Sequence, residues 1–357
     1  MKTGSTASRS SARCGQRGAR GAAERRAPRR YCRAMQAILA VTVPFFALVV
    51  CGYLAAQRRV LPEGAIPGLN TFVLYFALPC MLFRFGMTTP VRELLDPVLL
   101  AVYVISALSI VAFTIAVTRG PTTDLKDASF GALVAAFPNS GFMGVPLLVA
   151  LLGPAAAGPA ILTMLADMLI TSSLCIALAQ AHDASGQGAR AAGVRALRGA
   201  LSNPLPWAIC AGMLFSAFGW RTSGPVDVVL RMFADAASPV ALFTIGAVLW
   251  RAGRHAHTRP APRQYVPVAL IKLLLHPLLV FALAAGARAL GAPITPFQVM
   301  VLTLVAALPS ASNVSLLAER YGADNGRIAY IIMLSTALAF VSFTLLAWGF
   351  GAQAVSP

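Results

Sequence analysis

The stretch from Leu133 to Pro146 is apolar enough to lie in a membrane, but its middle cannot stay helical. Pro138 lacks a backbone N–H and Gly141 and Gly144 lack a Cβ atom, so we expect the helix to break near the middle of the membrane. Irregular backbone at that depth is tolerated only where it is buried in protein or lines a polar cavity, because unpaired backbone groups are costly in hydrocarbon. The break therefore indicates a binding site, although a simple proline kink is the alternative.

A second stretch of the chain repeats this pattern. Leu-Val-Ala-Ala, an apolar residue and proline begin at Leu133 and again at Leu304, 171 residues later. A weaker match relates Ala77–Phe83 to Ala237–Phe243, at an offset of 160, and chance similarity between alanine-rich helices is the alternative for it. Matching interrupted segments in two halves of a chain are typical of transporters built from inverted repeats, with the binding site where the interruptions meet.

The composition indicates an all-α polytopic membrane protein. Hydrophobic residues make up 58% of the chain and charged residues 11%, and the mean hydropathy is +0.73. With about 20 apolar residues per crossing, we predict ten transmembrane helices, at residues 37–56, 66–86, 97–117, 128–152, 159–180, 203–219, 226–250, 266–290, 296–318 and 327–349. Five helices then fall in each repeat, at 35–180 and 203–351, with a cytoplasmic linker at 181–202 between them.

The net charge of +17 is concentrated in a tail, which argues against a nucleic-acid partner. Residues 1–34 carry ten of the 29 Lys and Arg and only one acidic residue, Glu24. The tail is rich in Arg, Ser and Ala without apolar periodicity, so we expect it to be disordered. It can be a transit-like segment, a lipid-binding arm, or upstream DNA translated past a true start at Met35.

The positive-inside rule orients the ten spans. One set of alternate loops carries 13 Lys and Arg and the other set carries four. The heavier set should be cytoplasmic, which places both termini outside. An Arg-rich tail on the outer side contradicts the rule, so we favour translation from Met35.

The breaks offer donors for a carboxylate. The start of each half-helix carries a partial positive charge and free N–H groups, near residues 140–142 and 311–313. Neighbouring polar side chains can add donors without fixed charge. The candidate substrate-binding residues are Pro138, Asn139, Ser140, Gly141, Pro309, Ser310, Ser312 and Asn313.

Ionisable residues inside spans usually mark function because they are costly there. Lys272 and His276 share one helix face and can balance an anion or carry a proton. The alternative is that Lys272 extends to the cytoplasmic surface and a carbonyl satisfies His276. Asp167 is expected to be coupled to a cation or to Lys272 across the core. Arg84 and an Arg231/Asp235 ion pair are instead assigned to structure.

Other chemistries find little support in the sequence. The six cysteines form no CxxC pair and His255 and His257 lie among arginines, so no metal or cofactor is expected. An intramembrane protease would need facing aspartates or a His-Glu-x-x-His motif, and neither is present. A channel remains an alternative, because breaks also line pores.

Five segments of the chain resemble the auxin efflux carrier family, in its bacterial branch of malonate and other organic-anion permeases. They are Phe72–Pro79, Pro138–Pro146, Lys272–Pro277, Pro309–Asn313 and Ala318–Tyr321. The resemblance covers about residues 36–350, and its Pro-Asn-x-Gly-Phe-Met-Gly-x-Pro run is specific. The tail matches nothing in the family, and the long cytoplasmic loop of plant auxin carriers is missing, so auxin is not assumed as substrate.

The resemblance implies ten helices in two inverted five-helix repeats, with broken fourth and ninth helices that cross. Helices one, two, six and seven would form a scaffold that often dimerises, and helices three to five and eight to ten a mobile transport core. It also implies a secondary transporter in a bacterial inner membrane that carries small organic acids by alternating access, with H⁺ or Na⁺ as a candidate coupling ion. A sodium/bile-acid-symporter-like carrier is a further alternative.

Overall fold

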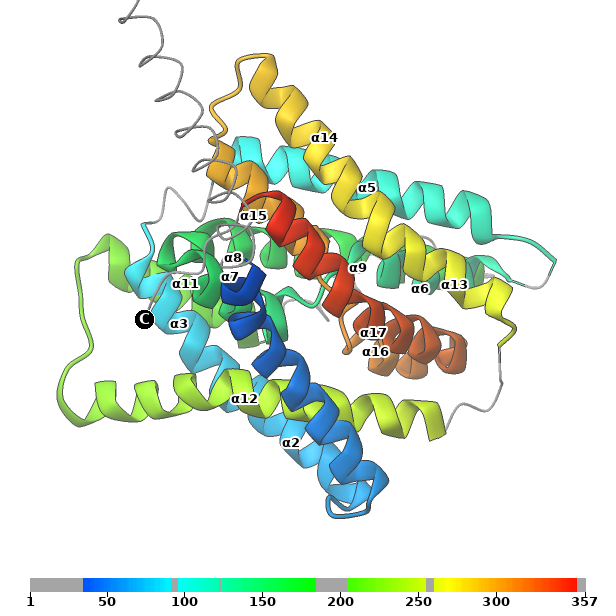
Figure 1. Cartoon of the computed structure of the whole chain (residues 1–357), viewed down its shortest axis with the longest axis horizontal. Coiled ribbons are helices and arrows are strands. Elements are labelled where there is room, and N and C mark those ends of the chain that lie inside the picture. The colour runs from blue at the N-terminus through cyan, green and yellow to red at the C-terminus, as the bar shows by residue number, and fades with distance from the viewer. Residues whose placement is uncertain (1–34, 91–95, 122, 184–203, 255–259, 352–357) are drawn as a thin grey trace, which may run out of the picture.

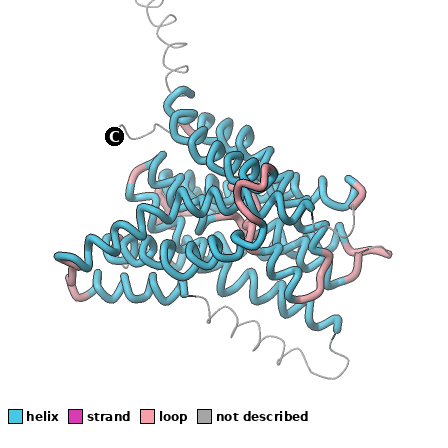
Figure 2. Tube along the Cα trace, turned by 90° about the horizontal axis from the view of Figure 1, so that it is seen from below, coloured by secondary structure: helices cyan, strands magenta, loops and turns pink. Residues whose placement is uncertain are grey.

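The computed structural model describes residues 35–90, 96–121, 123–183, 204–254 and 260–351, so the predicted tail at 1–34 and most of the predicted linker lie outside it. The regular elements of this part are helices (Figures 1 and 2). Seven helices are long and apolar enough to cross a membrane, and shorter apolar helices accompany them. The seven are Met35–Gln57, Glu63–Thr88, Pro97–Thr118, Pro154–Gln180, Gly224–Arg251, Pro262–Ala289 and Asn325–Gly349. The expectation of an all-helical polytopic membrane protein is confirmed.

The predicted fourth and ninth spans are each divided into two helices, and the sixth is short. After helix Met35–Gln57, the elements are α2 (Ile66–Phe72), α3 (Leu78–Thr88), α5 (Pro97–Thr118), α6 (Leu125–Ala136), α7 (Val145–Leu152), α8 (Ala157–Ala166), α9 (Ser172–Asp183), α11 (Pro204–Ala217), α12 (Gly224–Arg254), α13 (Pro262–Leu270), α14 (His276–Ala289), α15 (Pro296–Ala306), α16 (Val314–Arg320) and α17 (Asn325–Gly349). The pairs α6/α7 and α15/α16 are the divided spans.

Four wide π-helical turns interrupt the helices, and none of them was predicted from the sequence. They are Val73–Ala77, Ser140–Gly144, Asp167–Thr171 and Ile271–Leu275. Three of them end two residues before Pro79, Pro146 or Pro277. Proline lacks an N–H and its ring clashes with the carbonyl four residues earlier, so the preceding turn widens. Asp167–Thr171 has no such proline, and π turns of that kind are frequent at functional sites.

The helices form two groups (Figure 1). Helix Met35–Gln57, α2, α3 and α12 cross one another in one group, whereas α5, α14, α15 and α17 lie together in another. α11 packs along α3 and so joins the first group.

Glycines allow the helices of the first group to touch backbone to backbone. A Cβ atom on Gly52 would overlap the carbonyl oxygen of Phe243 in α12, and one on Gly246 would overlap the carbonyl oxygen of Val49. Helix Met35–Gln57 and α12 therefore cross with no side chain between them at this point.

The crossing of α3 and α11 is built in the same way. A Cβ atom on Gly212 would overlap the carbonyl oxygen of Phe83, and one on Gly86 would lie 2.9 Å from the carbonyl oxygen of Ile209. Neither pair of helices can move apart or rotate without losing this close fit.

Two arginines of this group are held in ion pairs, but one expected partner was wrong. Arg84 contacts Asp227 with an N–O distance of 2.7 Å, and Arg231 contacts the same carboxylate at 2.9 Å. Arg231 was expected to pair with Asp235. Asp227 lies equally one turn away and is further fixed by the hydroxyl of Thr222, so the carboxylate of Asp227 is the one that is held in place.

Candidate functional site

The two breaks lie against each other, as the repeated pattern predicted. The N–H of Asn139 donates to the carbonyl of Pro309 at 2.8 Å, and the N–H of Ala311 donates to the carbonyl of Phe137 at 3.0 Å. These bonds form an isolated antiparallel bridge between Pro138 and Ser310. The two interrupted segments thus form hydrogen bonds with each other through backbone groups that are not used within a helix. Backbone groups buried in a membrane need such partners.

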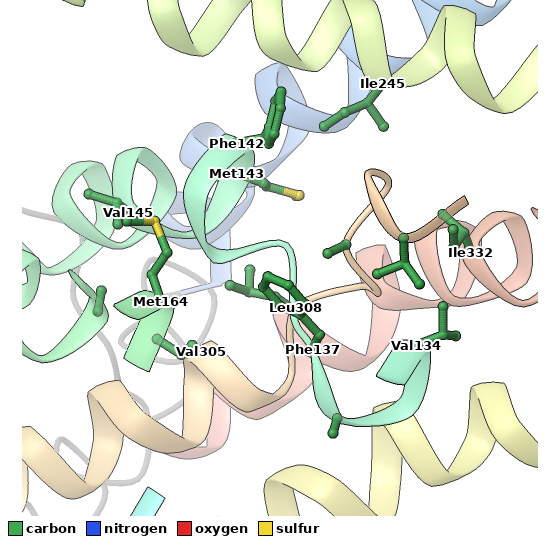
Figure 3. Close-up of a cluster of buried hydrophobic side chains, with 14 of the residues drawn as sticks. Val134, Phe137, Phe142, Met143, Val145, Met164, Ile245, Val305, Leu308 and Ile332 are labelled. Carbon is green, nitrogen blue, oxygen red and sulfur yellow. The ribbon is translucent and has the colours of Figure 1, made fainter. Parts of the chain in front are cut away.

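The apolar residue before each proline packs at this crossing. Figure 3 shows Phe137 and Leu308 overlapping where the two segments meet, and both are buried. A Cβ atom on Gly144 would overlap a methyl group of Leu308. The expectation that Gly141 and Gly144 break the helix is therefore wrong: both lie inside the π turn Ser140–Gly144, and Gly144 instead makes room for Leu308.

Four backbone N–H groups around the crossing have no acceptor among the residues that the structure describes. They belong to Gly141, Phe142, Ser312 and Asn313. They lie where the helical backbone resumes after each break, and unpaired N–H groups at such points attract anions. These are the two points at which the sequence predicts free donors.

The asparagine side chains are the other unused donors of the crossing. Asn139 is 3% exposed and Asn313 is half-buried. Neither amide forms a hydrogen bond with another residue in the described part of the chain. Buried amides normally have partners, so these two are available to a bound molecule.

The candidate serines have structural partners instead. The N–H of Ser310 donates to the hydroxyl of Ser335 at 3.2 Å, and the two hydroxyl oxygens lie 3.1 Å apart. The carbonyl of Ser312 accepts from the hydroxyl of Ser315, while the hydroxyl of Ser140 lies 3.5 Å from the carbonyl of Pro138. Ser335 was not among the predicted residues, since α17 carries no break that would draw attention to it.

Asp167, the first of the predicted ionisable residues, is fully buried and anchored by hydroxyl groups. The hydroxyl of Tyr103 donates to Oδ2 at 2.6 Å, and that of Thr171 donates to Oδ1 at 3.0 Å. Tyr103 was missed, because a single tyrosine within an apolar helix has no distinctive sequence signal.

Lys272 and His276 form a second part of this buried cluster. Nζ of Lys272 donates to the carbonyl of Ala306 at 3.0 Å and lies 3.0 Å from Nδ1 of His276. The alternative that Lys272 extends to the surface is wrong, since the residue is fully buried. Nε2 of His276 is buried without a partner among the described residues, so no carbonyl satisfies it. Asp167 and Lys272 form no ion pair among those described, but their charges interact across the core, which agrees with the expected coupling between them.

Comparison with known proteins agrees with this architecture. The family model described as "Membrane transport protein" matches residues 37–347. The chain is 31% identical over 315 residues to a Rhizobium meliloti protein named "Putative malonate transporter". The aligned region covers 87% of this chain and 95% of the Rhizobium protein.

More distant relatives span similar lengths. An "Uncharacterized transporter" of Methanothermobacter thermautotrophicus is 29% identical, over 84% of this chain and 93% of its own. "Auxin efflux carrier component 8" of Arabidopsis thaliana is 23% identical, over 85% of this chain and 96% of its own. The chain is a multi-pass membrane transporter that belongs to the membrane transport protein family, also called the auxin efflux carrier family.

Proposed function

We propose that the protein is a carrier of small organic anions, such as mono- or dicarboxylates, and that the two crossing breaks form its substrate site. The observation that carries the proposal is the set of unused donors at the crossing: two asparagine amides and four backbone N–H groups within the buried core. Donors without fixed positive charge can replace the water around a carboxylate and still release it. The name of the Rhizobium relative supports malonate as a first substrate to try.

We also infer that the two halves are inverted repeats. The glycine contacts support this, because every residue of one crossing has its counterpart 160 positions later in the other: Val49 and Ile209, Gly52 and Gly212, Phe83 and Phe243, Gly86 and Gly246. Chance similarity of alanine-rich helices does not account for matching contacts as well as matching residues. The offset is the one that relates Ala77–Phe83 to Ala237–Phe243.

Alternating access follows from this arrangement. The glycine-locked group (helix Met35–Gln57, α2, α3, α11 and α12) would serve as a rigid scaffold. The remaining helices would carry the crossing toward one side of the membrane and then the other. Because the two repeats have opposite orientations, each can adopt the conformation that the other had, which exposes the site alternately.

The orientation can be tested at two exposed loop positions. From the charge asymmetry we expect both termini outside the bacterial inner membrane, Val60 (80% exposed) inside and Leu290 (91% exposed) outside. In a chain whose own cysteines are replaced, an impermeant maleimide should label Leu290→Cys in intact cells. It should label Val60→Cys only after the membrane is permeabilised. The reverse pattern would invert the topology.

The proposed function predicts saturable exchange. Purified protein in proteoliposomes loaded with unlabelled malonate should take up labelled malonate faster than protein in proteoliposomes without internal malonate. The reason is that the binding site of a carrier returns across the membrane with a second substrate molecule bound. A neutral solute of similar size serves as the control and should not be exchanged. Current that is proportional to voltage and independent of internal malonate would identify a channel, and absence of any anion flux would reject organic-anion transport.

A further inference from the structure

The buried cluster beside the crossing consists of Asp167, Lys272 and His276, and both carboxylate oxygens of Asp167 accept hydrogen bonds. Asp167 is fully buried, and each of its carboxylate oxygens accepts a hydroxyl hydrogen bond, one from Tyr103 and one from Thr171. The carboxylate is held in one orientation by these bonds. These two bonds use about half of the roughly four lone-pair sites of a carboxylate. The described residues bring no group of three or more His, Cys, Asp or Glu together that could complete a metal site around it.

The positive part of the cluster has a different character. Nζ of Lys272 and Nδ1 of His276 lie 3.0 Å apart, and a hydrogen bond at that distance needs one donor and one acceptor. If both groups carried their full complement of protons, both would be donors and both would be cations, and they would repel each other. The pair can therefore hold one exchangeable proton.

The second ring nitrogen of His276 gives this proton a route. Nε2 is buried and has no partner among the described residues, although nearly all buried nitrogens have one. Tyr103 lies near the ring, at 6.2 Å between centroids. Because Nε2 of His276 has no described partner, it is free to exchange a proton with water when the site opens to one side of the membrane.

The pair also contacts the end of the helix that leads into the second break. Nζ of Lys272 donates to the carbonyl of Ala306, the last residue of α15 and three residues before Pro309. The loss of a proton from Lys272 would weaken this bond. The protonation of the pair and the geometry of the break are therefore linked.

Few other titratable groups face this cluster. Asp167 in its π turn interacts with Lys272, and Tyr103 on α5 and Cys175 on α9 interact with Asp167. The remaining titratable residues of the adjacent helices α6, α13, α14 and α17 lie within two turns of a helix end, and α15 has none. They are Lys126, Asp127, Arg263, Tyr265, Arg288, Arg327 and Tyr330. The exchange is thus confined to this cluster, and within it the hydrogen bond between Lys272 and His276 at 3.0 Å is the one that requires a shared proton.

We propose that this cluster couples transport to protons: Lys272 and His276 bind one proton that crosses with the organic anion, and Asp167 is the fixed counter-charge. This inference rests on the proposed carrier function. To release the proton, an N–H bond of the Lys272 ammonium breaks as a new one forms at Nδ1 of His276. The N–H bond at Nε2 breaks in turn, and that proton passes to water. The hydrogen bond between Nζ and Nδ1 then runs in the opposite direction, and the pair is neutral.

The test uses the full chain in proteoliposomes with the membrane voltage held at zero. An inward proton gradient of one pH unit should concentrate labelled malonate about tenfold inside, since one coupled proton supplies a tenfold driving force per unit. A sodium gradient should give no accumulation. Accumulation driven by sodium, or malonate exchange with no response to the proton gradient, would overturn the coupling and leave the carrier standing. Absence of exchange would reject both.

Variants of the cluster identify the coupling group. Lys272→Met should abolish proton-driven accumulation, so that labelled malonate only equilibrates at whatever rate remains. The double variant Asp167→Asn/Lys272→Met keeps the buried site neutral and serves if the single variant does not fold. Ser172→Ala, one residue beyond Thr171, removes a hydroxyl that bonds only to its own helix and should keep the tenfold accumulation. Full accumulation in a folded Lys272 variant would overturn the assignment.

Discussion

Replacing Gly52, Gly246 or Gly212 by alanine will remove most of the folded protein. In each case the added Cβ atom overlaps a backbone carbonyl oxygen, which cannot rotate away as a side chain can. The helices must separate, and such overpacking costs typically about 1–3 kcal/mol and more when backbone has to move. Folded proteins are stable by only about 5–15 kcal/mol, so a large share of the stability is lost. We expect aggregation on size-exclusion chromatography and a markedly lower unfolding temperature in detergent.

Gly286→Ala is the matched control for this prediction. Gly286 lies in α14, and a Cβ atom there would meet no atom within 4 Å. Alanine favours a helix over glycine by about 0.8–1.0 kcal/mol, so this variant should be at least as stable as the parent. If Gly52→Ala and Gly212→Ala fold as well as Gly286→Ala, the two crossings are not the rigid contacts inferred here.

Much of the architecture could be predicted because membranes impose simple rules on sequence. Apolar length located the seven helices that are long enough to cross a membrane, and proline located the breaks at Pro138 and Pro309. The repeated pattern further predicted that these breaks would meet. The hydrogen bonds of Asn139 and Ala311 across the crossing confirm it.

The details that the sequence did not reveal depend on three-dimensional contacts. Tyr103 reaches Asp167 from another helix, 64 positions away, and no local pattern marks that contact. Gly144 was read as a helix breaker, but its role depends on Leu308 of the other break. Asp227 rather than Asp235 pairs with Arg231 because Arg84 and Thr222 also bind it. In the first two cases the contacting residue is distant in the sequence. In the third, two aspartates lie one helical turn from Arg231, and the sequence does not distinguish them.

Removing either asparagine amide of the crossing should weaken substrate binding strongly without harming the fold. A hydrogen bond to a charged group is worth about 1.5–3 kcal/mol, so Asn139→Ala and Asn313→Ala should each raise the malonate dissociation constant roughly 10- to 150-fold. Neither amide bonds to a described residue, so its loss costs the folded protein no hydrogen bond. The unfolding temperature should be unchanged or higher. Asn70→Ala, on α2 of the scaffold group, makes the same chemical change away from the crossing and should alter neither property.

The most direct test of the shared site is a double-mutant cycle on malonate binding. The dissociation constant is measured for the parent, Asn139→Ala, Asn313→Ala and the double variant, all shown to be folded. If both amides hold one anion, each single change weakens binding, and the double variant departs from the sum of the two effects by at least about 0.5 kcal/mol, as residues that share a partner do. Unchanged malonate binding in both folded single variants would contradict the account, and the crossing would then be a structural contact alone.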